Sequence, residues 1–225
     1  MKVSNESDNK GVIMTSEDSK SEITLNKSNP ETLDVLMTRR SVKARDMVSP
    51  GPDKETLDKI LNAAIRVPDH GKLTPWRFIV LEGAEREKLG DLIANVLISE
   101  NNTSEKIAEK MKGYATQGPT LVVAIFSPSN ERPIPIWEQW LSAGAACQNM
   151  LIAATALGVA SQWLTGWAST SRTVASGLGL SEMEQIAGFI FFGTQKEAPE
   201  ERPRPDLNDR VIFGMPDPSE AAGCQ

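Results

Sequence analysis

The sequence predicts a single domain of the α/β or α+β class, in which helices and strands alternate. The chain has 225 residues, a length that suits one domain with one substantial core. Segments in which apolar residues recur with helical spacing alternate with short, continuous apolar runs typical of buried strands. Hydrophobic residues make up 40% of the chain, as in ordinary globular proteins, and its glycines and prolines form no repeat.

The two ends of the chain differ from its middle in composition. Residues 1–30 are predicted to be a disordered extension, because they hold too few apolar groups to offset the entropy of ordering. The folded domain is expected to span residues 31–214, and residues 215–225 to form a flexible tail. The extension lacks the apolar stretch of a signal peptide, and Met150–Ala160 is too short to span a bilayer. We therefore expect a soluble protein.

Charge, cysteine and histidine content exclude several function classes. A net charge of -6 disfavours nucleic acid or an anionic membrane as the main partner. The cysteines, Cys147 and Cys224, form neither a disulfide framework nor a metal-ligand set, which favours a reducing cytosol. The single histidine, His70, excludes most histidine metal sites and leaves little basis for a Ser-His-Asp hydrolase. We predict a cytoplasmic protein without a metal.

The first half of the folded region begins with two helices. A short amphipathic helix from Glu31 is expected to run into a basic cluster at residues 39–43. Asp53 can cap a second helix, which Pro68 ends. The segments expected next are a strand at Trp76–Glu82, a helix around Leu89–Leu97, a polar stretch at Asn101–Gln117 and a buried strand at Thr120–Phe126.

The second half contains the longest helical candidate, Ile136–Leu157, whose alanines and Gly144 would let another backbone approach closely. The elements expected after it are a strand at Val159–Leu164, a turn at Gly166, a short helix from Ser171, a capping pair at Ser181 and Glu184, and a strand at Gln185–Phe192. The tail from Glu197 to Asp209 is too rich in proline to be a central strand, while Val211–Phe213 could be an edge strand.

The usual nucleotide motifs do not occur in the chain. Gly177-Leu178-Gly179 lacks the third glycine of a dinucleotide fingerprint, and Gly71-Lys72 lacks a P-loop context. Arg39, Ser41 and Lys43 alternate, so an extended chain would point them the same way, which suits a phosphate dianion. A solvated helix end that interacts with the helix dipole would show the same pattern.

Two further segments could form walls around a flat heterocycle. Residues 68–78 place polar groups and Trp76 on a turn between a helix and a strand. Residues 163–167 end a strand, and Gly166 there permits close backbone approach to a ligand. In both segments the tryptophans could instead be anchors of the core.

In this order, the segments resemble the nitroreductase family of FMN-dependent enzymes, especially its short bacterial branch, over about residues 31–214. The combination of matches is more specific than any single match. The matching features are Arg-x-Ser-x-Lys at Arg39, Ser41 and Lys43, Pro-Trp-Arg-Phe at Pro75–Phe78, and Gly193-Thr194 followed by the basic tail Arg202–Pro205.

The resemblance implies a fold and a set of FMN contacts. The fold would be three-layer α/β/α, with a mixed sheet flanked by helices, in a homodimer that holds FMN at the subunit interface, where Ile136–Leu157 is a candidate contact. Lys43 would lie near the ring, where a cation favours the negative charge left by two-electron reduction. The other implied FMN contacts are Arg39, Arg40, Ser41, Arg202 and Arg204 at the phosphate and ribityl chain, and Leu164, Thr165 and Gly166 at the ring near N5. The resemblance leaves open whether His70 and Thr74 contact the ring edge.

The implied activity is hydride transfer from NAD(P)H through flavin N5 to nitroaromatic, quinone or similar electron-poor planar acceptors, by a ping-pong route. A Rossmann fingerprint is not required, because the nicotinamide visits the open flavin face and leaves. Two alternatives stay open: a flavin-binding or sensing module with little turnover, and an FMN enzyme that oxidises or dehalogenates a specific metabolite.

Overall fold

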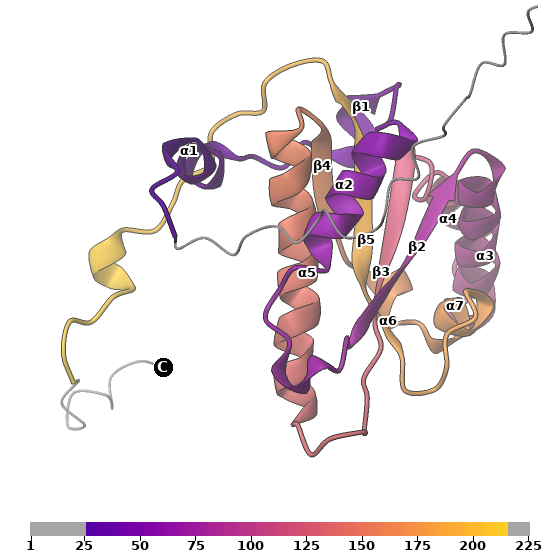
Figure 1. Ribbon diagram of the computed structural model, residues 1–225. Helices are drawn as coiled ribbons and strands as arrows, with labels where there is room; N and C mark the ends of the chain where they lie inside the picture. The colour runs from indigo at the N-terminus through magenta and orange to yellow at the C-terminus, as the bar shows by residue number, and fades with distance from the viewer. Residues whose placement is uncertain (1–25, 216–225) are drawn as a thin grey trace, which may run out of the picture.

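The computed structural model describes residues 26–215. Most of these residues form three layers, a central sheet with a layer of helices on each of its faces (Figure 1). Most of the predicted disordered extension and flexible tail, residues 1–25 and 216–225, lies outside the described residues. The helices and strands are α1 (Pro30–Thr38), β1 (Met47–Val48), α2 (Lys54–Ala64), β2 (Trp76–Glu82), α3 (Ala84–Asn101), α4 (Glu105–Lys112), β3 (Thr120–Phe126), α5 (Ile136–Ala156), β4 (Ala160–Leu164), α6 (Trp167–Thr170), α7 (Arg172–Gly177) and β5 (Gln185–Gln195), with short 3-10 turns at Ala44–Asp46, His70–Lys72 and Leu207–Asp209.

The longest strand, β5, organises the sheet. It pairs with β3, β4 and β1, and β2 pairs with the far side of β3. Every strand pair in residues 26–215 is antiparallel, so the prediction of a mixed sheet is wrong for these strands. The reason is visible between β2 and β3: Thr120 pairs with Glu82, so α3 and α4 return the chain to the end of the sheet that it left.

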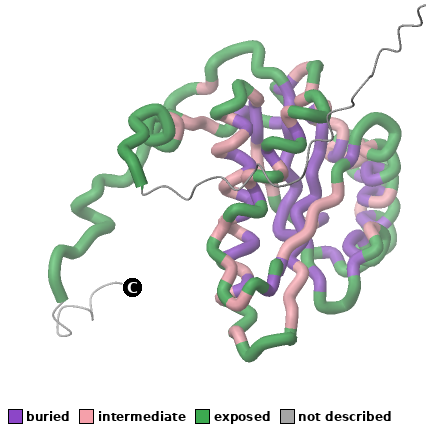
Figure 2. The backbone as a smooth tube through the Cα atoms, in the orientation of Figure 1, coloured by how far each residue is buried: buried purple, intermediate pink, exposed green. Residues whose placement is uncertain are grey.

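Strand β3 shows how the sheet holds the two helical layers together. All of its residues are buried, and successive side chains point to opposite faces. Leu121, Val123 and Ile125 join the core beneath α3 and α7. Val122 and Ala124 join the core beneath α2 and α5. The predicted three-layer α/β/α arrangement is therefore confirmed, with its buried residues concentrated in the sheet (Figure 2).

Several elements lie where the sequence predicts them. Strands β2 and β3 have the predicted bounds, and α5 and β4 differ from theirs by one residue. Asp53 caps α2, because its carboxylate accepts the backbone N–H of Thr56 at 2.8 Å.

Other predictions need correction. The polar stretch contains α4, which was not predicted because only Ala108 in it is buried and the apolar signal is sparse. Strand β5 continues past Phe192 to Gln195, where it pairs with the unpredicted β1. Val211–Phe213 is not a strand, because these exposed residues pair with no strand in the described part of the chain.

Two segments lie apart from the three layers: α1 and the C-terminal arm, which we define as residues 196–215 (Figure 1). No residue of α1 is buried, and the exposed residues of both segments form green stretches in Figure 2. The predicted apolar side of α1 faces solvent in the single chain, with Met37 76% exposed. Phe213 of the arm is 89% exposed.

None of the helices in residues 26–215 has the length and apolar character needed to cross a membrane.

Candidate functional site

Backbone contacts fix the basic segment, residues 39–43, to the edge of β4. The Val42 N–H donates to the carbonyl oxygen of Ser161 at 3.1 Å. The Ala44 N–H donates to Oε1 of Gln162 at 2.6 Å. Val42 and Ala44 are buried, whereas Ser41 and Lys43 are exposed. Of the three residues predicted to alternate, Ser41 and Lys43 are exposed and face outward from the sheet, whereas Arg39 is half-buried.

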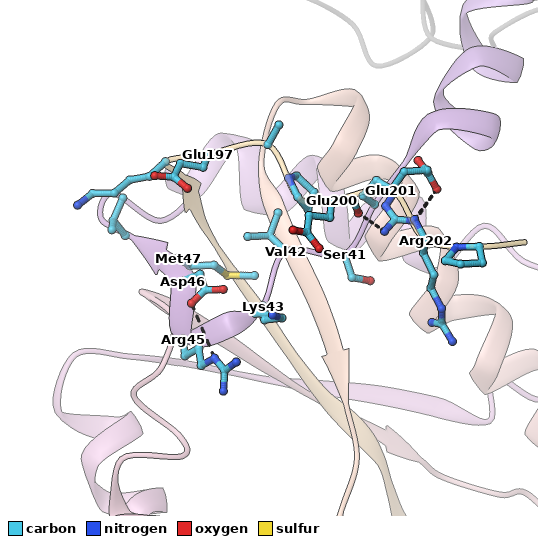
Figure 3. A pocket seen from close by; sticks show the side chains of 16 residues that line it. Ser41, Val42, Lys43, Arg45, Asp46, Met47, Glu197, Glu200, Glu201 and Arg202 are labelled. Atoms are coloured by element: carbon cyan, nitrogen blue, oxygen red, sulfur yellow. Dashed lines mark hydrogen bonds and ion pairs between the residues drawn. The ribbon is translucent and has the colours of Figure 1, made fainter.

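The C-terminal arm crosses the basic segment and encloses a cavity of about 810 Å³ with it (Figure 3). Arg40, Ser41 and Lys43 line one side of this cavity, and residues 196–203 line the other. Arg202 is among the arm residues that line it. The fold thus brings together predicted site residues that are about 160 positions apart in the sequence, as the Arg40 contact with Glu201 shows.

Carboxylate and carbonyl groups of the arm hold Arg40. Its Nη1 lies 2.7 Å from Oε1 of Glu201, and its Nη2 donates to the carbonyl oxygen of Glu200. The same Glu201 oxygen accepts the backbone N–H of Arg202 at 2.8 Å and lies 3.7 Å from Nε of Arg204. Glu201 therefore lies between two arginines to which the resemblance to the nitroreductase family gives a phosphate-binding role.

Arg39 has a different environment from Arg40. Its Nη2 donates to Oγ of Ser41 at 3.3 Å, and it forms no ion pair within residues 26–215. Burial lowers the pKa of Arg39, and the positive charges of Arg204 and Arg40 lower it further. The guanidinium still remains charged at neutral pH. Arg39 and Arg204 therefore belong to one positively charged cluster, although neither of them lines the cavity.

The cluster has unused capacity to bind an anion. The Nε atoms of Arg39 and Arg40 are buried and have no hydrogen-bond partner among the described residues. Guanidinium groups donate to phosphate in a planar, bidentate geometry, and a hydroxyl such as that of Ser41 can add a further bond. A phosphate monoester carries a charge of about -1.5 to -2 at pH 7, which suits several neighbouring arginines. These residues therefore fit a phosphate group.

The end of β4 carries the second predicted group. Leu164 lies three residues beyond Ser161, about 10 Å along the strand at ~3.3 Å per residue. It packs partly against the core. Thr165 lines a separate cavity of about 580 Å³. Gly166 has a φ of 138°, a conformation that favours glycine, and its N–H donates to Oγ of Ser169 at 3.3 Å.

His70 and Thr74 occupy a third location. Nδ1 of His70 lies 2.5 Å from Oε1 of Glu138 in the first turn of α5, beside a cavity of about 360 Å³. The Thr74 N–H donates to Asp69 at 2.8 Å. From Glu138 to the end of α5 at Ala156 is about 27 Å at ~1.5 Å per residue, and only then does the chain turn into β4. A single chain therefore does not bring His70 to the arginine cluster.

Two of the tryptophans considered as ring walls are anchored inside the fold. Nε1 of Trp76 donates to Oγ of Ser142 at 3.1 Å. Nε1 of Trp163 donates to the carbonyl oxygen of Ala187 at 3.1 Å. Gly188 makes room for this indole, because a Cβ at that position would lie 2.0 Å from Nε1 of Trp163. The alternative that these two residues anchor the core is the one that the structure supports.

Three residues of the site regions were not singled out in the sequence. Gln162 holds the backbone of the basic segment, Glu201 contacts its arginines, and Glu138 pairs with the only histidine. A glutamate beside Arg202 is a local signal of charge pairing, but its contact with Arg40 depends on the path of the arm. Nothing local in the sequence marks Gln162 or Glu138.

Comparisons with known proteins agree with this architecture. Residues 36–194 match the model of the nitroreductase family. The chain is 31% identical over 189 residues to the Escherichia coli K12 protein named "Putative NAD(P)H nitroreductase YdjA", with 84% of this chain and 96% of that protein covered.

Solved structures share the fold over most of their length. A nitroreductase-like family protein from Bacillus cereus has a TM-score of 0.70 at 25% identity, with 86% of this chain and all of that chain (100%) covered. A nitroreductase from Bacteroides fragilis, crystallised with bound FMN, has a TM-score of 0.63 at 22% identity, with 84% and 100% covered. Because the family model spans more than half of the chain, this protein belongs to the nitroreductase family of oxidoreductases.

Proposed function

We propose that this protein binds FMN and transfers hydride from NAD(P)H to nitroaromatic, quinone or similar electron-poor planar acceptors. The observation that carries the proposal is the meeting of the basic segment and the C-terminal arm around one cavity. Bound FMN would supply the two-electron chemistry, by accepting a hydride from the nicotinamide and passing it to the acceptor. The nicotinamide donor is supported by the name of the E. coli relative.

The arginine cluster would hold the phosphate end of FMN. Arg39 and Arg40 offer buried Nε–H groups without partners in the described chain, and Ser41 offers a hydroxyl. Arg202 and Arg204 would add charge from the arm. Because charge-assisted, bidentate contacts are the strong ones, this end of the site would contribute much of the affinity and would distinguish FMN from riboflavin.

The ring would lie toward the end of β4. The basic segment runs along this strand, so Leu164, Thr165 and Gly166 are within about 10–17 Å of the anchor at Ser161, as the strand rise sets the spacing. An extended ribityl chain together with the isoalloxazine ring would bridge such a gap. Lys43 lines the same cavity as Arg40 and Ser41, and we propose that its ammonium tunes the ring.

We further propose that the working unit is a homodimer. His70 and Thr74 lie too far from the arginine cluster for one FMN to contact both in a single chain, and a second copy could supply them. The single chain also exposes large apolar side chains on three of its segments, and contiguous exposed apolar surface marks interaction sites. These side chains are Leu33, Leu36 and Met37 of α1, Trp137 and Leu141 of α5, and Leu207, Ile212 and Phe213 of the arm. The half-exposed Gly144 of α5 leaves open space around its Cα, which agrees with a close helix contact.

A cytoplasmic location is part of the same proposal. It is supported by the presence of only two cysteines in the sequence. Burial of Cys147 in α5 raises the pKa of its thiol to about 12, so this cysteine is an unreactive core residue.

The proposal is tested by the absorption spectrum of the purified protein under nitrogen. We expect a flavin spectrum that NADH or NADPH bleaches and that a nitroaromatic or quinone restores. A protein that takes up no FMN would contradict the proposal. Bleaching by dithionite but by neither NADH nor NADPH would instead favour a flavin-binding module. Sedimentation of the same sample would show whether the protein is a dimer.

A further inference from the structure

The carboxylate of Glu201 occupies the middle of the arginine cluster. Its Oε1 lies 2.7 Å from Nη1 of Arg40 and 3.7 Å from Nε of Arg204, and it accepts the N–H of Arg202 at 2.8 Å. An anion that used these same donors would compete for them with Glu201. The carboxylate and a phosphate carry charge of the same sign, so the two groups would also repel each other at this distance.

The two partners of this ion pair differ in freedom. The Arg40 side chain is only 17% exposed and also donates to the carbonyl oxygen of Glu200, whereas the Glu201 side chain is 73% exposed. Exposed carboxylates exchange partners at little cost, because water replaces the lost contacts. The arginine is therefore the fixed member of the pair, and the glutamate is the member that an incoming anion can displace.

We propose that Glu201 is an internal competitor of the FMN phosphate and thereby a specificity-determining residue at the phosphate end of the site. The inference deepens the proposed function and rests on it. The Glu201 carboxylate neutralises part of the positive charge of the cluster through its ion pair with Arg40. When FMN binds, its phosphate replaces this carboxylate as the partner of Arg40. Arg202 and Arg204 are on the same arm, so the exchange replaces one anion by another while the arm's own cations stay at the site.

This exchange has different consequences for charged and neutral flavins. An FMN phosphate that uses Nη1 of Arg40 must displace Glu201 from it, so part of the phosphate binding energy is offset by the lost ion pair. Riboflavin has no phosphate and leaves the pair intact. Glu201 therefore weakens FMN binding selectively, and its removal would widen the preference for FMN over riboflavin.

Equilibrium titration of the cofactor-free full-length protein with FMN and with riboflavin tests this inference, with the quenching of flavin fluorescence as the readout. Glu201→Gln removes the charge and keeps an acceptor oxygen of the same reach. Because the glutamate is exposed, we expect a modest effect: FMN binds about three- to fivefold more tightly, and riboflavin affinity changes less than about twofold. Glu197→Gln is the matched control, since Glu197 lines the same cavity but makes no ion pair within the described residues.

Each result decides the inference. Unchanged or weaker FMN binding by Glu201→Gln would overturn it, because the glutamate would then not compete with the phosphate or would help to position Arg40. An equal gain for riboflavin, or an equal gain from Glu197→Gln, would also overturn it, since the effect would not be local to the phosphate. If the wild-type protein binds no FMN at all, the proposed function fails together with the inference, whereas wild-type binding that Glu201→Gln leaves unchanged refutes the inference alone.

Discussion

Gln162 accepts the backbone N–H of Ala44 at 2.6 Å and so links the start of β4 to the segment that carries the cations of the site. This bond and the bond from Val42 to Ser161 hold residues 39–43 in an extended conformation beside the sheet. The orientation of Ser41 and Lys43 depends on it, because a shift of one residue would turn both side chains inward.

Loss of this link should loosen the basic segment without unfolding the domain. Gln162→Ala leaves the N–H of buried Ala44 without its acceptor, a change that costs about 1–3 kcal/mol. We expect the free energy of unfolding in urea to fall by that amount and FMN to bind more weakly. Gln162→Glu, which keeps an acceptor oxygen, should restore much of the stability. Wild-type stability in Gln162→Ala would show that the bond has no anchoring role.

The charge of Lys43 should affect the bound flavin more than it affects FMN affinity. Lys43→Met retains the length of the side chain but removes a cation that would stabilise the reduced ring. A surface interaction of about 1 kcal/mol corresponds to a reduction potential lower by roughly 20 mV for two electrons. Spectroscopic titration against a reference dye measures this shift. Lys196→Met is the control, since Lys196 lines the same cavity from the arm; an identical potential in wild type and Lys43→Met would remove the proposed role of Lys43.

The pair formed by Arg77 and Glu184 should make stability depend on pH in the acid range. Nε of Arg77 lies 2.6 Å from Oε1 of Glu184, and chiefly this hydrogen bond lowers the pKa of the carboxyl from 4.5 to about 2, with help from the Ser181 N–H. Because the folded pKa is the lower one, the stabilisation is complete above about pH 4.5 and is lost as the pH falls toward 2. Arg77 is 40% exposed, so solvent screening reduces the effect to roughly 1–3 kcal/mol.

Urea unfolding of wild type and Glu184→Gln at neutral pH and at about pH 3 measures this contribution. The wild type should be the more stable protein at neutral pH, and the difference should shrink at the acid pH, where the Glu184 carboxyl of the unfolded wild type gains a proton while that of the folded protein stays mostly ionised. Parallel stability curves for the two proteins would contradict the assignment.

Burial of the Tyr114 hydroxyl lowers the stability of the fold, and a substitution can remove this hydroxyl. Its Oη is buried without a partner among the described residues, and burial raises the pKa of Tyr114 to about 12. The ring packs edge-on against Phe189 at 5.6 Å and Phe191 at 5.9 Å between centroids. Tyr114→Phe keeps this packing, so we expect unchanged stability or a gain of up to about 1 kcal/mol. Tyr114→Ala should lose about 2–4 kcal/mol in the same unfolding measurement; a clear loss in Tyr114→Phe would indicate that the hydroxyl has a partner.

The sequence predicts those parts of the fold that depend on local pattern. The continuous apolar run of β3 and the capping residue Asp53 are decided by neighbouring residues, and both are confirmed. The direction of a strand depends on the whole connection before it and not on neighbouring residues. The prediction of a mixed sheet was wrong because the α3–α4 connection returns the chain to Thr120 beside Glu82, and α4 lies in a polar stretch with little apolar signal. The alternation of Arg39, Ser41 and Lys43 indicates a candidate anion site from local spacing, whereas the Glu201 contact with Arg40 depends on the path of an arm 161 residues away.

The central claim is that the arginine cluster binds FMN through its phosphate, and the ratio of riboflavin to FMN dissociation constants tests it most directly. For the wild-type protein we predict that FMN binds at least about tenfold more tightly than riboflavin, since a charge-assisted, bidentate contact is worth roughly 1.5–3 kcal/mol. Arg39→Ala should abolish most of this preference, while Arg45→Ala, which alters an exposed arginine that lines the cavity beside the cluster, should retain it. Equal affinity of the wild type for FMN and riboflavin would contradict the account.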